Sequence, residues 1–90
     1  MAWTIELSPR ARKNLDRLDR QIAQRILRFL NDRIAQRDDP RAVGEALAGD
    51  KLGEFWKYRV GDYRVVSRIE DGRMVVVAIR IAHRREVYRD

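Results

Sequence analysis

Basic side chains in the C-terminal half of this 90-residue chain are spaced so that folding would bring several of them together. Lys57 and Arg59 are two residues apart, so on a strand both project from the same face. Arg64 follows a Gly-Asp turn predicted at 61–62, and hairpin pairing would bring it near Val60 or Arg59. Cations held this close repel one another unless an anion lies between them, which predicts a site for phosphate.

Each of these residues also has a plainer interpretation. Lys57 and Arg59 could be ordinary surface cations, which contribute little by themselves. Arg64 could be a structural residue that pairs with Glu70 or with a backbone carbonyl oxygen. The overall charge favours an anionic partner, because 20 Lys and Arg stand against 14 Asp and Glu, a net charge of +6.

The C-terminal segment 81–88 adds three further candidates directly after the most apolar stretch of the chain. His83 is a possible proton donor or acceptor, Arg84 a possible clamp for phosphate, and Tyr88 a ring on which a base could stack. A lone histidine is more often a surface or hydrogen-bonded residue, and the ring of Tyr88 could simply cap the core.

Several classes of function are excluded by what the sequence lacks. There is no cysteine and only one histidine, so no Cys-ligated or His-rich metal site is possible. Neither a dinucleotide-binding glycine motif nor a P-loop occurs, and no pair of carboxylates is spaced for catalysis. We therefore expect no cofactor and no metal. No apolar stretch approaches the ~20 residues of a membrane span, which predicts a cytoplasmic protein without a membrane partner.

Residue patterns predict two helices between a first strand and three later ones. Residues 2–7 alternate like a half-buried strand, and Ser8-Pro9 is typical of a helix start. Asp19 is a plausible cap for a second, longer helix that ends at Asp38-Asp39-Pro40. Residues 41–53 are predicted to form a loop.

Strand patterns dominate from residue 54 onward. Strands are predicted at 55–60, 63–69 and 74–79, with a hairpin turn at 70–73 in which Gly72 adopts a positive φ. The whole chain, 1–90, is then a single α+β domain in the order strand–helix–helix–strand–strand–strand. The helical hairpin covers one face of a four-stranded, mostly antiparallel sheet. The first strand lies parallel beside the last, and the open face carries the C-terminal charge.

This order and two sequence segments resemble the RelE branch of the RelE/ParE toxins of bacterial toxin–antitoxin pairs. The segments are Trp-Lys-Tyr-Arg-Val-Gly-Asp-Tyr-Arg-Val-Val at 56–66 and His-Arg-Arg-Glu-Val-Tyr at 83–88. The first is shared across the superfamily, whereas the second is more specific to the RNA-cleaving branch. The resemblance implies a ribosome-dependent endoribonuclease, or mRNA interferase, that needs no metal. In such enzymes the 2′-hydroxyl of the RNA attacks the adjacent phosphate and leaves a 2′,3′-cyclic phosphate.

The resemblance also implies roles for individual residues. Lys57 and Arg59 match the family's basic strand pair, Arg64 its phosphate-contacting arginine, and Arg84 and Tyr88 its C-terminal pair. Arg64 and Arg84 would stabilise developing charge, and Tyr88 would stack on or orient a base.

The general base is left open by one departure from the family pattern. Arg59 stands where the family can have a lysine, and arginine is a poor base because it stays protonated. Lys57, among cationic neighbours that favour loss of a proton, or His83 could serve instead. An RNA-cleaving toxin is expected to gather these residues, with Arg84 and Tyr88, on one surface.

Partners follow from the same resemblance. A RelB-like antitoxin is expected to cover Lys57, Arg59 or Arg84 with an acidic, partly disordered segment, or to draw the C-terminus out of place. The ribosome and messenger RNA would be the targets, and DNA would be contacted only through the antitoxin. The alternatives are a ParE-like inhibitor of DNA gyrase that cuts no RNA, and an RNA-binding module without activity.

Overall fold

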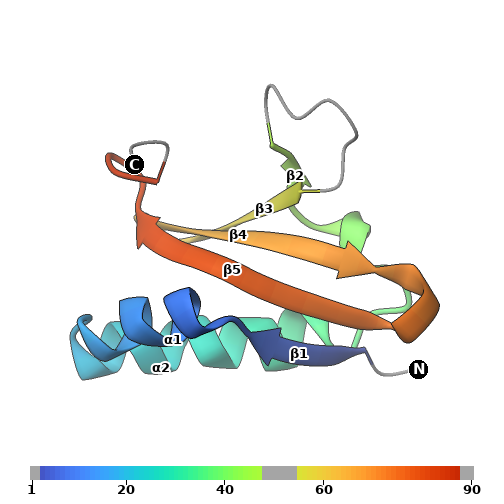
Figure 1. The fold of residues 1–90 in the computed structure, drawn as a ribbon, viewed down its shortest axis with the longest axis horizontal. Coiled ribbons are helices and arrows are strands. Elements are labelled where there is room, and N and C mark those ends of the chain that lie inside the picture. Colours follow the sequence, from blue (N-terminus) through green and yellow to red (C-terminus); the bar gives the residue numbers. More distant parts are fainter. Residues whose placement is uncertain (1–2, 48–54, 88–90) are drawn as a thin grey trace.

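Two helices pack against one face of an open sheet in the computed structural model, which describes residues 3–47 and 55–87 (Figure 1). The expected α+β class and the order of the main elements are confirmed. The regular elements are β1 (Thr4–Leu7), α1 (Pro9–Asp16), α2 (Arg20–Phe29), β2 (Glu45–Ala46), β3 (Phe55–Val60), β4 (Tyr63–Glu70) and β5 (Val75–His83).

The sheet has five strands in the order β1-β5-β4-β3-β2, so the expected count of four is wrong. The additional strand, β2, lies within the segment predicted to be a loop and pairs antiparallel with the outer side of β3. Its two residues are too few to show any alternation, which is why the sequence did not reveal it. The expected parallel pairing of the first strand with the last is confirmed, since β1 runs parallel to β5.

Both predicted helix starts are confirmed. The Ser8 hydroxyl accepts a hydrogen bond from the backbone N–H of Ala11 at 3.0 Å and donates to the carbonyl oxygen of Ile79 at 2.8 Å. It therefore caps α1 and ties it to β5. The Asp19 carboxylate caps α2 by accepting from the N–H of Gln21 at 2.8 Å.

The second helix ends differently from the prediction. After Phe29 it widens into a π-helical turn, Leu30–Ile34, and stops before the predicted end at 38–40. The turn closes where the N–H of Ala35 donates to the carbonyl oxygen of Leu30 at 2.9 Å. Ile26, Leu30 and Ile34 are four residues apart, a spacing that would drift around a regular helix. The wider turn keeps all three buried against the sheet.

The core lies between the helices and the sheet. Tyr58 is fully buried in it, and its hydroxyl donates to the carbonyl oxygen of Pro40 at 2.8 Å. Burial raises the pKa of this hydroxyl, so it stays a neutral donor. The other large side chains that are fully buried come from the second helix and from β4 and β5: Ile26, Leu30, Ile34, Val65, Val76 and Ile81.

The β4–β5 hairpin lies where it was predicted, but Gly72 does not have the predicted role. Residues Asp71–Arg73 form a 3-10 turn, and the left-handed residue is Met74, with φ 54°. Residues inside such a helical turn have negative φ, and the residue with positive φ comes directly after the turn. The expectation that Gly72 adopts a positive φ is therefore wrong.

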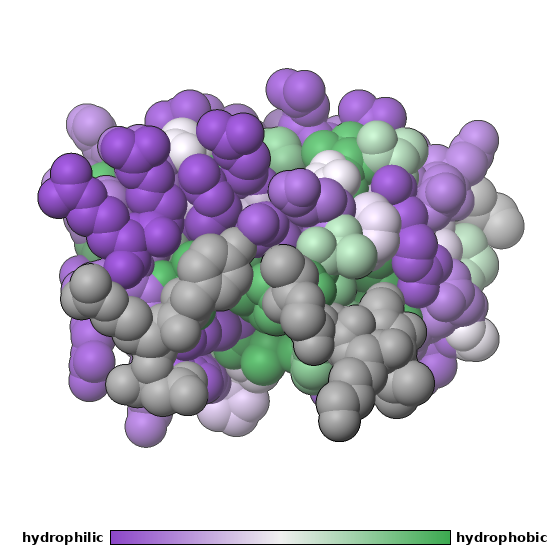
Figure 2. Space-filling model, turned by 90° about the horizontal axis from the view of Figure 1, so that it is seen from above, coloured by the Kyte–Doolittle hydropathy of each residue, from purple (hydrophilic) through white to green (hydrophobic). Residues whose placement is uncertain are grey.

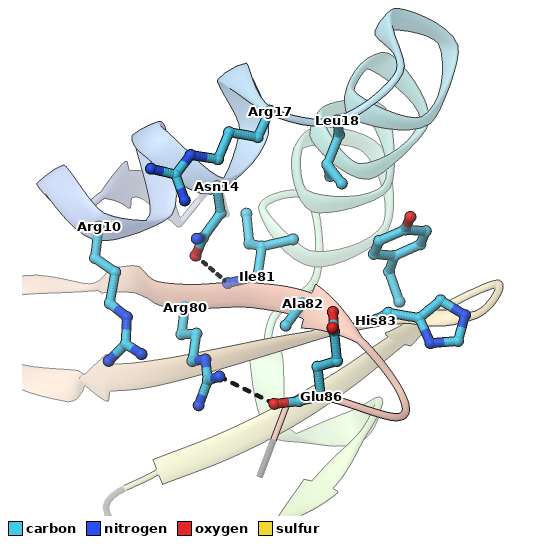
Figure 3. A pocket seen from close by; sticks show the side chains of 10 residues that line it. Arg10, Asn14, Arg17, Leu18, Arg80, Ile81, Ala82, His83 and Glu86 are labelled. Atoms are coloured by element: carbon cyan, nitrogen blue, oxygen red, sulfur yellow. Dashed lines mark hydrogen bonds between the residues drawn. The ribbon is translucent and has the colours of Figure 1, made fainter. Parts of the chain in front are cut away.

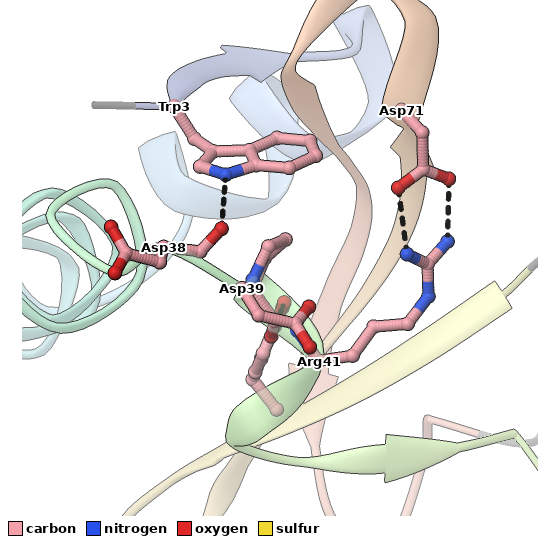
Figure 4. A network of polar contacts seen from close by, with 7 residues as sticks. Trp3, Asp38, Asp39, Arg41 and Asp71 are labelled. Carbon is pink, nitrogen blue, oxygen red and sulfur yellow. Dashed lines mark hydrogen bonds and ion pairs between the residues drawn. The ribbon is translucent and has the colours of Figure 1, made fainter. Parts of the chain in front are cut away.

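Side-chain contacts of Trp3 and Arg41 help to hold the segment after the second helix (Figure 4). The indole N–H of Trp3 donates to the carbonyl oxygen of Asp38 at 3.1 Å. The guanidinium of Arg41 binds both carboxylate oxygens of Asp71, at 2.8 and 3.0 Å. This bidentate pair connects the segment to the β4–β5 turn.

The Arg41–Asp71 pair makes the stability of the protein depend on pH. Hydrogen bonds from Arg41 hold the pKa of the Asp71 carboxyl below its usual value. The pair therefore stabilises the fold above about pH 4, the ordinary range of aspartate, and its contribution falls as the pH drops through the lowered pKa. Because both side chains are partly exposed, we expect less than about 1 kcal/mol.

A double-mutant cycle with Arg41→Gln and Asp71→Asn measures this contribution. The coupling in the free energy of urea unfolding should be present at pH 7 and diminished at pH 2.5. A coupling of equal size at both pH values would contradict the assignment.

Ser67 leaves a polar atom unsatisfied in the core. Its side chain is fully buried, and its hydroxyl has no hydrogen-bond partner within the described residues. A buried hydroxyl without a partner costs free energy, so Ser67→Ala is expected to raise the free energy of unfolding by about 1 kcal/mol. Ser8→Ala is the matched comparison and should lower it by about 1 kcal/mol, because that serine caps α1. Equal destabilisation by the two substitutions would refute the interpretation of Ser67.

Candidate functional site

Basic side chains gather on the face of the sheet opposite α1 and α2, which we call the open face. Lys57 and Arg59 on β3 alternate with the core residues Tyr58 and Val60, as their spacing predicted. In the view onto this face, apolar side chains lie near the centre and hydrophilic ones around them (Figure 2). The sheet thus presents cations beside an apolar surface.

Arg59 and Arg64 face each other directly across β3 and β4, which confirms the predicted hairpin pairing. Nη1 of Arg64 donates to the carbonyl oxygens of Gly61 and Tyr63, at 3.1 and 2.9 Å. The alternative of a backbone partner is therefore also correct, whereas Glu70 pairs with other arginines. Like charges directly opposite one another are unfavourable, so this pair favours an anion.

Arg84 lies at the same end of the sheet as Arg59 and Arg64, beside the turn between β3 and β4. Its backbone N–H donates to the carbonyl oxygen of Asp62 at 2.7 Å, and its Nε lies 3.9 Å from a carboxylate oxygen of Asp62. Gly61, with φ 60°, allows the tight turn between β3 and β4 that Arg64 and Arg84 both contact. The β3–β4 turn thus brings together Arg59, Arg64 and Arg84.

Lys57 lies further along β3, with 17% of its side chain exposed. Its Nζ is 3.7 Å from a carboxylate oxygen of Glu45, which β2 places opposite it. Sequence reasoning missed Glu45 because the strand that carries it was not recognised.

Arg80 is a second residue that sequence reasoning missed. It lies on β5 in register with Val66, which in turn pairs with Lys57, so all three share the open face. Its guanidinium donates to the carbonyl oxygens of Val87 at 2.7 Å and Glu86 at 3.0 Å. Arg80 therefore holds the turn that follows β5. The signal available in the sequence was a single charge in an otherwise apolar strand.

An apolar cavity of about 390 Å³ opens beside Arg80 on the same side of the molecule. Phe55, Val66, Ile79 and Val87 contribute its apolar lining. An apolar hollow bordered by cations suits a partner that carries both acidic and apolar side chains.

The structure does not bring His83 onto the open face. His83 pairs with Tyr63, and Ile81 with the core residue Val65, so both pairs lie on the helix-covered face. The rings of His83 and Tyr63 meet edge to face, with centroids 5.5 Å apart. Tyr88 lies outside the described residues, so its predicted role stays a prediction.

The arrangement suits the stabilisation of negative charge on a phosphate. Arg59, Arg64 and Arg84 lie around one turn, and backbone carbonyl oxygens hold the guanidinium of Arg64. A positioned guanidinium group can hold a phosphoryl oxygen more tightly as its charge grows. Among residues 3–47 and 55–87, no three His, Asp or Glu side chains are grouped to hold a metal ion. No helix in that part of the chain is long and apolar enough to cross a bilayer.

Comparisons with known proteins agree with this fold. The family model of the ParE toxin of the type II toxin–antitoxin system parDE matches residues 5–88. Toxin RelG of Mycobacterium tuberculosis is 32% identical over 89 residues, which cover 99% of each chain. Toxin RelE of the same organism is 34% identical over 87 residues, covering 97% of this chain and 87% of that one.

Solved structures show the same similarity. The toxin–antitoxin complex RelBE2 from Mycobacterium tuberculosis contains a chain that matches with a TM-score of 0.81 and 28% identity, covering 92% of each chain. The isolated Escherichia coli RelE toxin matches with a TM-score of 0.70 at 19% identity, which is evidence for the fold alone. The chain therefore belongs to the RelE/ParE superfamily and is a RelE-like toxin of a type II toxin–antitoxin system.

Proposed function

We propose that this toxin is a ribosome-dependent endoribonuclease that cleaves messenger RNA and so inhibits translation. The observation that carries the proposal is the direct pairing of Arg59 with Arg64, beside Arg84, at one end of the open face. No carboxylate forms an ion pair with Arg59 or Arg64 within the described residues. A phosphate is the group that best satisfies such a cluster.

The reaction needs no nucleophile from the protein. The 2′-hydroxyl of the RNA attacks the adjacent phosphorus while a base takes its proton, and the bond from phosphorus to the 5′-oxygen breaks. The leaving 5′-oxygen takes up a proton, so the products are a 2′,3′-cyclic phosphate and a 5′-hydroxyl. Arg64 and Arg84 would stabilise the charge on the phosphoryl oxygens. By family resemblance, Tyr88 would orient a base.

Lys57 is a better candidate for the base than His83. Lys57 lies on the same face as Arg59 and Arg64, whereas His83 faces the helices. A base must come within hydrogen-bond reach of the 2′-hydroxyl, so geometry favours the lysine. Arg59 would contribute charge rather than accept the proton.

A second candidate function is inhibition of DNA gyrase without RNA cleavage. It is supported by the match of residues 5–88 to the ParE toxin model. On this alternative the basic open face would dock a protein rather than RNA.

Two assays of the same purified toxin separate these functions. Primer extension on a defined messenger RNA in a purified translation system reports cleavage, and relaxation or supercoiling of plasmid DNA reports gyrase. The proposal predicts cuts within codons that require ribosomes, and normal gyrase activity. An intact message together with inhibited gyrase would overturn it.

We also propose a RelB-like antitoxin as the partner in the cell. Relatives of similar fold have been solved as complexes of RelB with RelE. An acidic segment with apolar side chains would fit both the cations of the open face and the apolar cavity beside Arg80. Ribosomes and messenger RNA would be targets in the cytoplasm, and DNA would be contacted only through the antitoxin.

Hydrogen–deuterium exchange of the toxin with and without its antitoxin tests this binding mode. Binding should slow exchange in β3 and in the segment after β5, which carry Lys57, Arg59 and Arg84. The outer side of α2 provides the internal comparison and should exchange at an unchanged rate. Protection confined to α1 and α2 would contradict direct covering of the site.

A further inference from the structure

We propose that a second cavity, beside α1, binds a phosphate of the single-stranded RNA that flanks the nucleotide being cut. This inference rests on the proposed function and extends its site around the edge of the sheet. The cavity has a volume of about 420 Å³ and lies between α1, the last residues of β5 and the turn after it (Figure 3). Of the described residues assigned to the cleavage step, the candidate His83 lines it, and Lys57, Arg59, Arg64 and Arg84 do not.

The cavity exists because α1 takes the place of a strand along the edge of β5. β1 pairs only with Val75 to Ala78. Beyond it, the Ser8 hydroxyl and the Asn14 side chain bond to backbone groups of Ile79 and Ile81, at 2.8 and 2.9 Å. The helix therefore stands beside the strand, and side chains one turn apart on it overhang the strand edge.

Arg10 reaches the cavity from the first turn of this helix, and Arg17 from the position directly after its last residue. They stand four residues before and three residues after Asn14, so all three lie along one side of α1. Neither arginine side chain has an ion-pair partner in the described part of the chain. Glu86 is the one carboxylate among the described residues that line the cavity, so Arg10 and Arg17 give it a positive charge that attracts an anion.

The opposite wall of the cavity suits RNA. Tyr63 and His83 line it with their rings in edge-to-face contact, a surface against which a base can pack. Ala82 also lines the cavity, and it pairs in register with Arg64 of the proposed cleavage site. A strand of RNA crossing from Arg64 therefore reaches the cavity within a few nucleotides.

Binding of short RNAs with 2′-deoxy substitution, which prevents cleavage, tests the proposal in the free toxin. Fluorescence anisotropy is measured with an octanucleotide and with a dinucleotide at several salt concentrations. Arg10→Gln/Arg17→Gln is the test variant. Arg12→Gln/Lys13→Gln is the matched control, because it removes the same charge from exposed positions of α1 that do not line the cavity.

The octanucleotide should bind the test variant about tenfold more weakly than the control variant, since both arginines that hold the phosphate in the cavity are lost. The slope of log Kd against log salt should also be smaller for the test variant than for the control variant by about 0.7, the value for one phosphate of a single strand. The dinucleotide should bind the two variants equally. If the test and control variants bound the octanucleotide with equal affinities and slopes while the toxin still cleaved ribosome-bound RNA, the phosphate site in this cavity would be refuted and the proposed function would stand. A wild-type toxin that neither binds nor cleaves RNA would overturn the proposed function as well.

Discussion

Replacing Arg64 with glutamine is expected to slow cleavage of ribosome-bound messenger RNA at least about 100-fold. This is the loss typical of removing one donor to an oxygen that gains charge in the transition state. Nη1 of Arg64 is held by the carbonyl oxygens of Gly61 and Tyr63, so the rest of the guanidinium is fixed in direction. Single-turnover primer extension at saturating toxin measures the effect.

Arg68→Gln is the matched control for this experiment. Arg68 lies on the same strand and the same face, four residues further along, where it pairs with Glu70. Its substitution should change the cleavage rate less than about threefold, as expected for an exposed ion pair away from the site. Thermal unfolding of both variants shows whether either is folded less stably. If Arg68→Gln slowed cleavage as much as Arg64→Gln, general charge rather than a positioned arginine would explain the activity.

Gly44→Ala is expected to lower the free energy of unfolding by about 3 kcal/mol, from the sum of backbone strain and overpacking. Gly44 has φ 81°, which an alanine adopts only at a cost. Its new Cβ would lie 2.9 Å from both Trp56 Nε1 and Tyr58 Cδ1, and would collide with the backbone carbonyl oxygen of Lys57. Because that carbonyl belongs to β3, relief of the collision would also displace the strand that carries Lys57.

Gly72→Ala provides the comparison for Gly44→Ala. Gly72 lies in the β4–β5 turn without a positive φ, and an added Cβ there would meet nothing within 4 Å. The Gly72→Ala substitution should change the free energy of unfolding of the protein by less than about 0.5 kcal/mol. Urea denaturation of the two variants measures the difference. If the Gly44→Ala and Gly72→Ala variants were equally stable, the segment at Gly44 would be able to accommodate a Cβ without strain, and the prediction would be wrong.

The parts of the fold that depend on local residue chemistry could be predicted from the sequence. The caps at Ser8 and Asp19 are short-range signals, and alternation placed Lys57 and Arg59 on one face of β3. The Gly-Asp turn at 61–62 predicted Arg64 near Val60 or Arg59, and in the structure it lies opposite Arg59. Turn and alternation together were enough to predict the centre of the proposed site.

The placement of β5 could not be predicted because of one irregularity. A β-bulge lies opposite Val66 and Ser67, where Ile79 has no partner on β4. An additional residue in a strand reverses which side chains face the core. Before the bulge Val76 and Ala78 point to the core, and after it Ile81 does. The bulge therefore turns Arg80 to the open face and His83 away from it.

On the proposed function, the 2′-hydroxyl of the message itself attacks the phosphate held at the open face. This attack is tested by primer extension on programmed ribosomes carrying either an all-ribose message or the same message with one 2′-deoxynucleotide at the cut position. We expect a cut in the first message and none at that position in the second. Cleavage of the deoxy-substituted message at the same position would contradict attack by the 2′-hydroxyl, because the nucleophile would then have to come from elsewhere.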